Sequence, residues 1–259
     1  MLSKLKSLSP NLSALLEIGI LFLPSIPAYL WIWPNVKGIH WWVTQSLVYL
    51  YVLGGTLWIG LRRWNWAQLG IKRQGLGLGL ACGVALVVGR TLVILSIDWE
   101  LPLPPFSLAR ILWEVVFYFG FVAFTEELLF RGLVYHLLDE WKGYRWAIWG
   151  SAIGFGLWHV FGQGLLVGLA MVLYGMIFAL ARWRTGGILG LVLAHGLIDF
   201  LAAQMLPTMD VADLGRPGIS CAICMLLGLT LIVITPIYFW KLHPILERKI
   251  TGLTNKGAH

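Results

Sequence analysis

Three short stretches of this sequence place acidic, basic and imidazole side chains inside otherwise apolar segments. The stretch FTEELLFRGL, residues 124–133, carries adjacent carboxylates at Glu126 and Glu127. The stretch FGLWH ends at His159, and HGLID begins at His195 and ends in an aspartate. Carboxylates and imidazoles are the side chains that most often transfer protons in catalysis. Together they can activate a water molecule, hold a metal ion or relay protons, depending on how the fold arranges them.

Spacing within two of these stretches decides which side chains share a helix face. Glu127 and Arg131 are four residues apart, so we expect them to lie on one face and to form an ion pair. This pairing makes their burial in an apolar segment tolerable. Glu126 points about 100° away from that face and is free to meet a different neighbour. His195 and Asp199 are also four residues apart and project from one face.

The elements that must position these side chains are transmembrane helices. Hydrophobic residues make up 59% and charged residues 12% of the 259 positions, whereas a soluble domain has about 25% charged residues. A hydrocarbon core about 30 Å thick requires about 20 apolar residues per helix. The sequence therefore predicts an all-α fold, a polytopic membrane helix bundle of about eight transmembrane helices forming a single membrane domain over residues 1–259. The predicted spans are 12–33, 41–61, 75–97, 108–138, 146–161, 165–181, 188–206 and 219–240.

Basic residues collect on one side of this predicted bundle. Eight spans put both termini on the same side, and most of the 19 Lys and Arg residues then fall on that side. Because positive loops stay in the cytoplasm, both termini are predicted to be cytoplasmic, in a bacterial plasma membrane. The lipid bilayer is thus an expected partner. No nucleic acid is expected, because the net charge of +7 forms no basic stripe with interleaved aromatics.

Glycines and a basic aromatic segment predict further details of packing. Gly75, Gly79 and Gly83 lie four residues apart on one face of the third predicted span, a pattern that permits close helix approach. Gly196, beside the imidazole of HGLID, is expected to keep that face of the seventh span open. The segment RRWNWAQLGIKR, residues 62–73, is predicted to lie in the cytoplasmic interface.

The depth of each buried polar group can be counted from the nearest cytoplasmic helix end, because a helix rises about 1.5 Å per residue. Glu126 lies about 20 Å deep and His159 about 21 Å. In the seventh span, His195 lies about 15 Å and Asp199 about 21 Å deep. A charge at mid-bilayer costs at least about 2.5–3.5 kcal/mol, so these groups are expected to face protein or water. Their similar depth favours one functional site, provided that the three helices are neighbours.

Taken together, EELLFRG, FGLWH and HGLID resemble the three motifs of the CPBP family of intramembrane proteases, which includes the CAAX prenyl endopeptidases and bacterial immunity-type relatives. The family pattern is Glu-Glu with Arg four residues later, Phe with His four residues later, and His with Asn or Asp four residues later. Phe155 and His159 match the second motif. The resemblance implies a catalytic core over residues 108–206 and an endopeptidase that cleaves a membrane-associated peptide or protein.

The resemblance also implies roles for individual residues. The implied catalytic residues are Glu126, His159, His195 and Asp199, and the implied supporting residues are Glu127, Arg131 and Phe155. Glu126 with His159 would activate water, while His195 and its neighbour at position 199 would stabilise the oxyanion. An ionised aspartate cannot donate a hydrogen bond, so Asp199 is either protonated or orients His195. No cofactor is expected; the alternative is a divalent metal such as zinc, held by His159, His195 and carboxylates.

Two other functions stay open from the sequence. Buried imidazoles and carboxylates also build proton relays, so a proton- or cation-coupled transporter is one alternative. Such transporters often contain inverted repeats, and none is found here. The other alternative is a non-catalytic bacteriocin-immunity or scaffold membrane protein, which could lose motif residues, whereas this chain retains them all.

Overall fold

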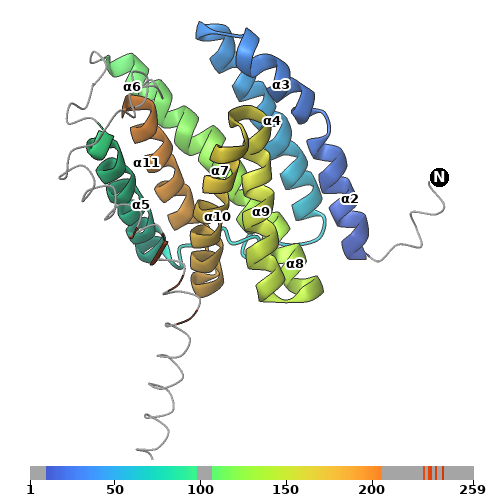
Figure 1. The fold of residues 1–259 in the computed structure, drawn as a ribbon. Coiled ribbons are helices and arrows are strands. Elements are labelled where there is room, and N and C mark those ends of the chain that lie inside the picture. Colours follow the sequence, from blue (N-terminus) through green and yellow to red (C-terminus); the bar gives the residue numbers. More distant parts are fainter. Residues whose placement is uncertain are drawn as a thin grey trace, which may run out of the picture.

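The computed structural model describes residues 10–97 and 107–205, together with the isolated residues 230, 233, 234, 237 and 241. Every regular element in this part of the chain is a helix, and the helices stand side by side in a bundle (Figure 1). Four stretches are long and apolar enough to cross a membrane: Asn11–Ala28, Ile39–Leu61, Leu108–Lys142 and Val167–Thr185. The predicted all-α membrane bundle is confirmed, and the chain is an integral membrane protein.

The helices follow one another with short connections. The first are α2 (Pro10–Phe22), α3 (Ser25–Asn35), α4 (Gly38–Leu61) and α5 (Leu76–Ile97). A long helical stretch then comprises α6 (Leu108–Val115), η1 (Val116–Ala123), α7 (Phe124–Glu127), η2 (Leu128–Val134) and α8 (Tyr135–Lys142), in which η1 and η2 are π-helical. The last described helices are α9 (Tyr144–Gln163), α10 (Leu165–Thr185) and α11 (Leu189–Met205).

Each of the first seven predicted spans overlaps helical elements: the first overlaps α2 and α3, the fourth the long stretch from α6 to α8, and each of the others one helix. The first span is divided into α2 and α3 by a turn at Pro24, because proline removes a helical hydrogen bond. The span predicted at 146–161 is longer than expected, since α9 continues to Gln163 and ends before Gly164, whose φ is +88°. The eighth predicted span, 219–240, lies outside the described residues apart from isolated positions, so the count of eight stays a prediction.

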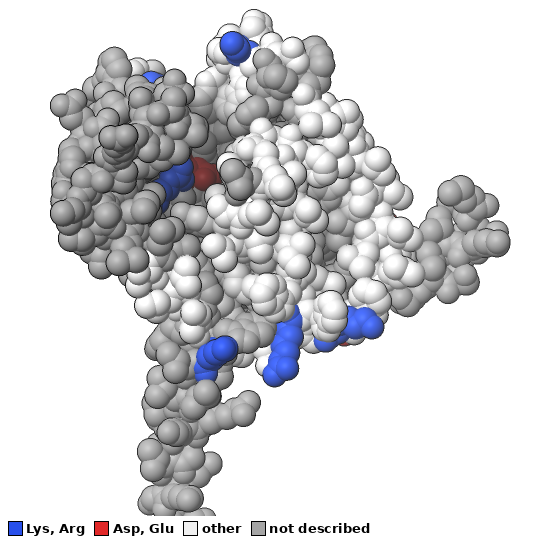
Figure 2. Space-filling model, in the orientation of Figure 1, with Lys and Arg blue, Asp and Glu red and all other residues white. Residues whose placement is uncertain are grey.

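Basic residues mark one end of the bundle. Arg62 and Arg63 follow α4, Lys142 ends α8, and Arg182 and Arg184 lie in the last turn of α10. Figure 2 shows Lys and Arg side chains along the lower edge of a broad face that is otherwise largely uncharged. This is the charge distribution of a lipid-facing wall above a basic rim. The assignment of that rim to the cytoplasm stays a prediction.

The predicted interfacial segment folds against this basic end as a series of turns between α4 and α5. Leu69 and Trp64 are buried, whereas Trp66 is exposed. The backbone N–H of Ile188, just before α11, donates a hydrogen bond to the carbonyl of Gly70 at 2.8 Å. This contact ties the segment to the start of the helix that carries the HGLID motif.

Small residues bring α5 and α11 into close contact, as predicted for Gly79 and Gly83. The prediction was wrong for Gly75, which has a φ of +81° and lies just before α5, where a Cβ atom would meet Thr185 of α10. A Cβ atom on Gly79 would lie 2.5 Å from the backbone of Gly190, and one on Gly83 would lie 2.3 Å from Cβ of Ala194. The expectation for Gly196 was wrong. The space beside it is filled by the ring of Phe119 from η1, which a Cβ atom on Gly196 would approach to 2.5 Å. Helix α11 is therefore held between α5 and the long helical stretch.

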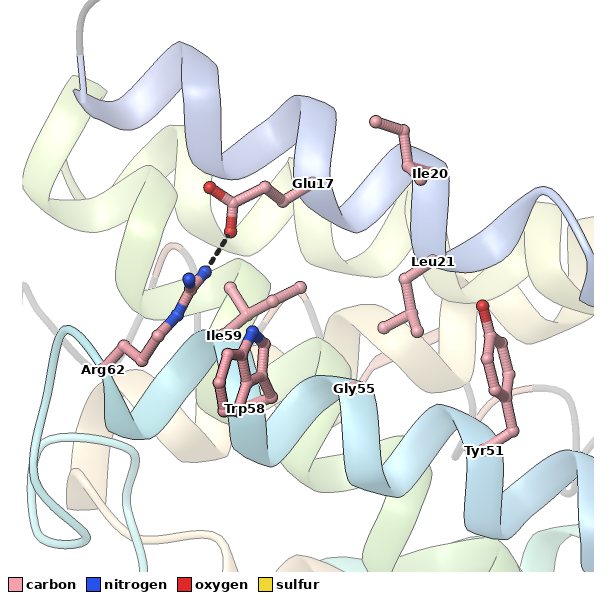
Figure 3. Close-up of a pocket in the computed structure, with 8 residues that line it drawn as sticks. All are labelled: Glu17, Ile20, Leu21, Tyr51, Gly55, Trp58, Ile59 and Arg62. Atoms are coloured by element: carbon pink, nitrogen blue, oxygen red, sulfur yellow. Dashed lines mark hydrogen bonds and ion pairs between the residues drawn. The ribbon is translucent and has the colours of Figure 1, made fainter. Parts of the chain in front are cut away.

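A surface groove lies between α2 and α4, with a volume of about 390 Å³. Figure 3 shows the residues that line it, including the ion pair between Glu17 of α2 and Arg62 just after α4. Glu17 also pairs with Arg63 at 2.8 Å. None of the motif residues lines this groove, so the candidate chemistry lies elsewhere.

Candidate active site

Glu126 lies where side chains from several helices meet, and it is 2% exposed. Its Oε2 atom is 3.9 Å from Nε2 of His159 in α9 and 3.7 Å from Nε2 of His195 in α11. The structure thus brings the predicted carboxylate and both predicted imidazoles together. The condition left open by the sequence, that α7, α9 and α11 are neighbours at this level, is met.

These separations suit a shared water molecule. Two polar atoms can hydrogen-bond to the same water when they are closer than about 5.6 Å, twice a typical hydrogen-bond length. Both imidazole nitrogens are within this limit of Glu126 Oε2, and both are beyond direct hydrogen-bond distance. Among the described residues, Oε2 has no hydrogen-bond partner. One carboxylate oxygen is therefore left to act on a small molecule placed beside the imidazoles.

The other oxygen of Glu126 is held by two neutral donors. Oε1 accepts a hydrogen bond from the hydroxyl of Tyr49 in α4 at 2.8 Å and from Nε1 of Trp158 in α9 at 3.0 Å. Sequence reasoning missed both residues. Trp158 stands next to His159 in the FGLWH motif, so its position in the motif could have pointed to it. Tyr49 is one of several aromatic residues in its span, and nothing in the sequence distinguishes it from the others.

His159 is oriented by its own helix. Its Nδ1 lies 2.8 Å from the carbonyl oxygen of Phe155, one turn earlier. A carbonyl only accepts hydrogen bonds, so Nδ1 carries the proton, and in the neutral ring Nε2 is left as an acceptor. Nε2 is the nitrogen that faces Glu126. His159 can therefore exchange a proton with a water molecule bound there.

His195 has a carboxylate at each ring nitrogen. Nδ1 lies 2.8 Å from Oε1 of Glu127, and Nε2 lies 3.3 Å from Oδ2 of Asp199. Both nitrogens can donate to these acceptors when the ring carries two protons. The side chain of Asp199 is 28% exposed, whereas that of His195 is 6% exposed. The predicted residue at position 199 therefore lies at the more accessible edge of the cluster.

The predicted ion pair between Glu127 and Arg131 is confirmed. Nη1 of Arg131 lies 3.0 Å from Oε1 of Glu127, and both side chains are fully buried. The guanidinium also lies over the ring of Phe155 at 4.2 Å and near that of Phe178 at 5.4 Å. Arg131 thus acts on Glu127, which in turn holds His195. Phe155 supports the site through this contact and through the carbonyl that holds His159.

Two π-helical stretches flank the glutamate pair, and no sequence pattern predicted them. A π-helix has more residues per turn than an α-helix, so η1 and η2 rotate side chains away from a regular helical register, as often occurs at functional sites. The guanidinium of Arg182 in α10 donates to the carbonyl of Arg131 in η2 at 3.0 Å, to that of Gln68 at 2.9 Å and to that of Gly186. Arg182 thereby links η2 to the basic end of the bundle.

The donor set does not form a ready metal site. Among the residues that the structure describes, no group of three or more His, Cys, Asp or Glu side chains is arranged to hold a metal ion. The Nδ1 atoms of His159 and His195 are engaged by Phe155 and Glu127, so only their Nε2 atoms are left to face a metal ion. We therefore derive no step through a metal.

An all-helical membrane bundle with a buried Glu and His cluster has the features of an intramembrane protease. Residues 108–201 match the family model described as type II CAAX prenyl endopeptidase Rce1-like. This match over part of the chain supports membership of the CAAX protease, or CPBP, family, and with it a CAAX-type intramembrane endopeptidase in general. No curated protein and no solved structure matches it. The family match favours a protease over the transporter and the non-catalytic immunity or scaffold alternatives.

Proposed function

We propose that this protein cleaves a peptide bond in a membrane-associated peptide or protein by means of a water molecule that Glu126 and His159 activate. One observation carries the proposal: Oε2 of Glu126, without a hydrogen-bond partner among the described residues, lies 3.9 Å and 3.7 Å from the Nε2 atoms of two imidazoles. A water molecule bound there contacts a carboxylate and an imidazole at the same time, which is the arrangement required for general-base catalysis.

The reaction can be written with these groups alone. Glu126 Oε2 accepts a proton from the water molecule while the oxygen of that water attacks the carbonyl carbon of the scissile bond. Nε2 of His195 faces the same space, and its N–H, which lies near Asp199 before the reaction, turns to donate to the oxyanion of the tetrahedral intermediate as that charge develops. Transfer of the proton to the leaving nitrogen, from Glu126 or through His159, releases an amine and a carboxylic acid, whose proton then passes to the amine or to solvent. One water molecule is consumed, and the enzyme returns to its starting state.

Asp199 acts on His195 in this scheme. Its Oδ2 is 3.3 Å from Nε2 of His195, so an ionised Asp199 orients the ring and stabilises its protonated form. This position supports the orienting role over direct donation to the oxyanion. Glu127 fixes the opposite nitrogen of the same ring at 2.8 Å. His195 is therefore held from both sides.

The bilayer and the substrate are the partners that this function requires. The length and apolar character of the surrounding helices support a site within the membrane, where the substrate must then reach it. We propose that both termini lie in the cytoplasm, on the basis of the basic end of the bundle; a bacterial plasma membrane stays an expectation. Reporter fusions to each terminus, active on only one side of the membrane, test this orientation.

Cleavage of a fluorogenic membrane peptide by the purified protein in lipid vesicles tests the reaction. Glu126→Gln, His159→Ala and His195→Ala are expected to lower kcat/KM by at least about 100-fold, the scale of general acid–base catalysis. Glu140→Gln and His136→Ala serve as matched controls, because these residues pair with each other on α8. Full cleavage by Glu126→Gln would overturn the assignment.

A chelator separates water activation by Glu126 from the zinc alternative. The proposal expects cleavage to continue unchanged in 1,10-phenanthroline and in EDTA. If cleavage is lost and zinc restores it, a metal held by His159, His195 and carboxylates becomes the mechanism instead.

A further inference from the structure

The two carboxylate oxygens of Glu126 have different surroundings. Oε1 receives two hydrogen bonds, from Tyr49 and Trp158, while Oε2 faces the two imidazoles. We propose that Tyr49 and Trp158 are positioning residues that hold Oε1 and so make Oε2 the oxygen that activates water. This inference rests on the proposed function and adds two residues to its machinery.

The direction of both hydrogen bonds to Oε1 follows from the chemistry of the groups. Trp158 Nε1–H is a donor and cannot accept, and a carboxylate oxygen accepts, so the Tyr49 hydroxyl must donate to it. Tyr49 and Trp158 are each 7% exposed, and Glu126 is 2% exposed. Water therefore competes poorly for these bonds, and hydrogen bonds to an ionised carboxylate are stronger than bonds between neutral groups.

We call these two hydrogen bonds to Oε1 the clamp. The carboxylate of a glutamate needs them because rotation about its terminal torsion, χ3, costs little energy. The terminal χ3 of glutamate is broad and roughly two-fold, so an unheld group exchanges its two oxygens and swings through a range of angles. Two donors from different helices, α4 and α9, fix both the torsion and the direction of Oε1. Oε2 is then held toward Nε2 of His159 and Nε2 of His195.

Packing holds the two donors themselves. The ring of Tyr49 meets the edge of Phe117 in η1, with centroids 6.2 Å apart and planes at 90°. The ring of Trp158 meets Phe22 of α2, with centroids 5.0 Å apart and planes at 84°. Tyr49 and Phe22 both precede the segment that matches the family model. The site is therefore completed by helices that lie before the matched segment.

Conservative substitutions test the clamp. Tyr49→Phe and Trp158→Phe each remove one donor and keep an aromatic ring. A misplacement of a catalytic group by about 1 Å can cost about 100-fold, so each change is expected to lower kcat by about 10-fold or more, with KM within about twofold. A role in structure alone would instead lower the melting temperature without this split between kcat and KM.

Two controls lie on the same helices. Tyr51→Phe alters a tyrosine that is 47% exposed and lines the groove toward α2 (Figure 3), and Trp146→Phe alters a tryptophan of α9 that is 63% exposed. Both are expected to retain the kcat of the wild type. Infrared difference spectra against Glu126→Gln identify the carboxylate stretch of Glu126, and Tyr49→Phe and Trp158→Phe are expected to shift it.

The two measurements separate this inference from the proposed function. If Tyr49→Phe and Trp158→Phe retain wild-type kcat, or shift the carboxylate band no more than the controls do, the clamp is refuted. If Glu126→Gln still cleaves, the proposed function fails. In that case the infrared spectra of Tyr49→Phe and Trp158→Phe still test the hydrogen bonds to Glu126, and a carboxylate band that does not shift would still refute the clamp.

Discussion

The buried ion pair between Glu127 and Arg131 allows a prediction of stability. Both side chains are fully buried, with Nη1 and Oε1 3.0 Å apart. Arg131→Met preserves much of the side-chain volume and leaves the carboxylate of Glu127 buried, with His195 as its remaining partner. Removing one partner of a buried pair costs about 3–5 kcal/mol, because the other charge loses its strongest compensation in a site that water does not reach.

This free energy translates into a large thermal effect. A loss of 1 kcal/mol lowers the melting temperature by about 2–4 °C in a domain of 150–250 residues. The Arg131→Met variant is therefore expected to melt about 6–20 °C below the wild type. Arg62→Met is the matched control, since its pair with Glu17 is 46% and 33% exposed. An exposed pair contributes about 0–1 kcal/mol, which corresponds to a decrease of less than about 4 °C.

Thermal unfolding of the purified variants in one detergent, followed by intrinsic tryptophan fluorescence, measures both shifts. The double variant Glu127→Gln with Arg131→Met removes both charges, so its loss of stability is expected to be at least about 1 kcal/mol smaller than the sum of the single losses. A decrease for Arg131→Met no larger than that for Arg62→Met would refute the reasoning. So would a double variant whose loss equals the sum.

Three further predictions concern the frame around the site. Asp199→Asn is expected to retain at least about one-tenth of wild-type kcat/KM, since an amide can still orient the neighbouring imidazole; a loss as large as that of the Glu126→Gln variant would contradict this. Gly79→Ala is expected to lower the melting temperature, because its Cβ atom would lie 2.5 Å from the backbone of α11, whereas Gly77→Ala, with nothing within 4 Å, is expected to be neutral or stabilising. Arg182→Met is expected to lower the free energy of unfolding by about 1–3 kcal/mol or more in chemical unfolding, because buried carbonyls lose their donor. Arg184→Met, at an exposed position of the same helix, is the control, and equal losses for the two variants would contradict the role of Arg182.

Local sequence determined the helices and part of the site. Runs of apolar residues predicted the membrane bundle, because lipid leaves helices as the simplest way to satisfy the backbone. The spacing of four residues predicted the Glu127–Arg131 pair, since such residues are adjacent on a helix. The rise per residue predicted that Glu126 and His159 reach a similar depth. Each of these predictions needs only the geometry of a single helix.

Tertiary structure decided which neighbours these side chains meet. The contacts of Glu126 with Tyr49 and Trp158 join residues 77 and 32 positions apart, so no local spacing encodes them. The Phe119 ring that fills the space beside Gly196 comes from another helix, and the π-helical turns around the glutamate pair follow no apolar pattern. Sequence fixes the level of a group along its own helix axis. The rotation and packing of neighbouring helices, which depend on all their side chains together, decide what that group touches.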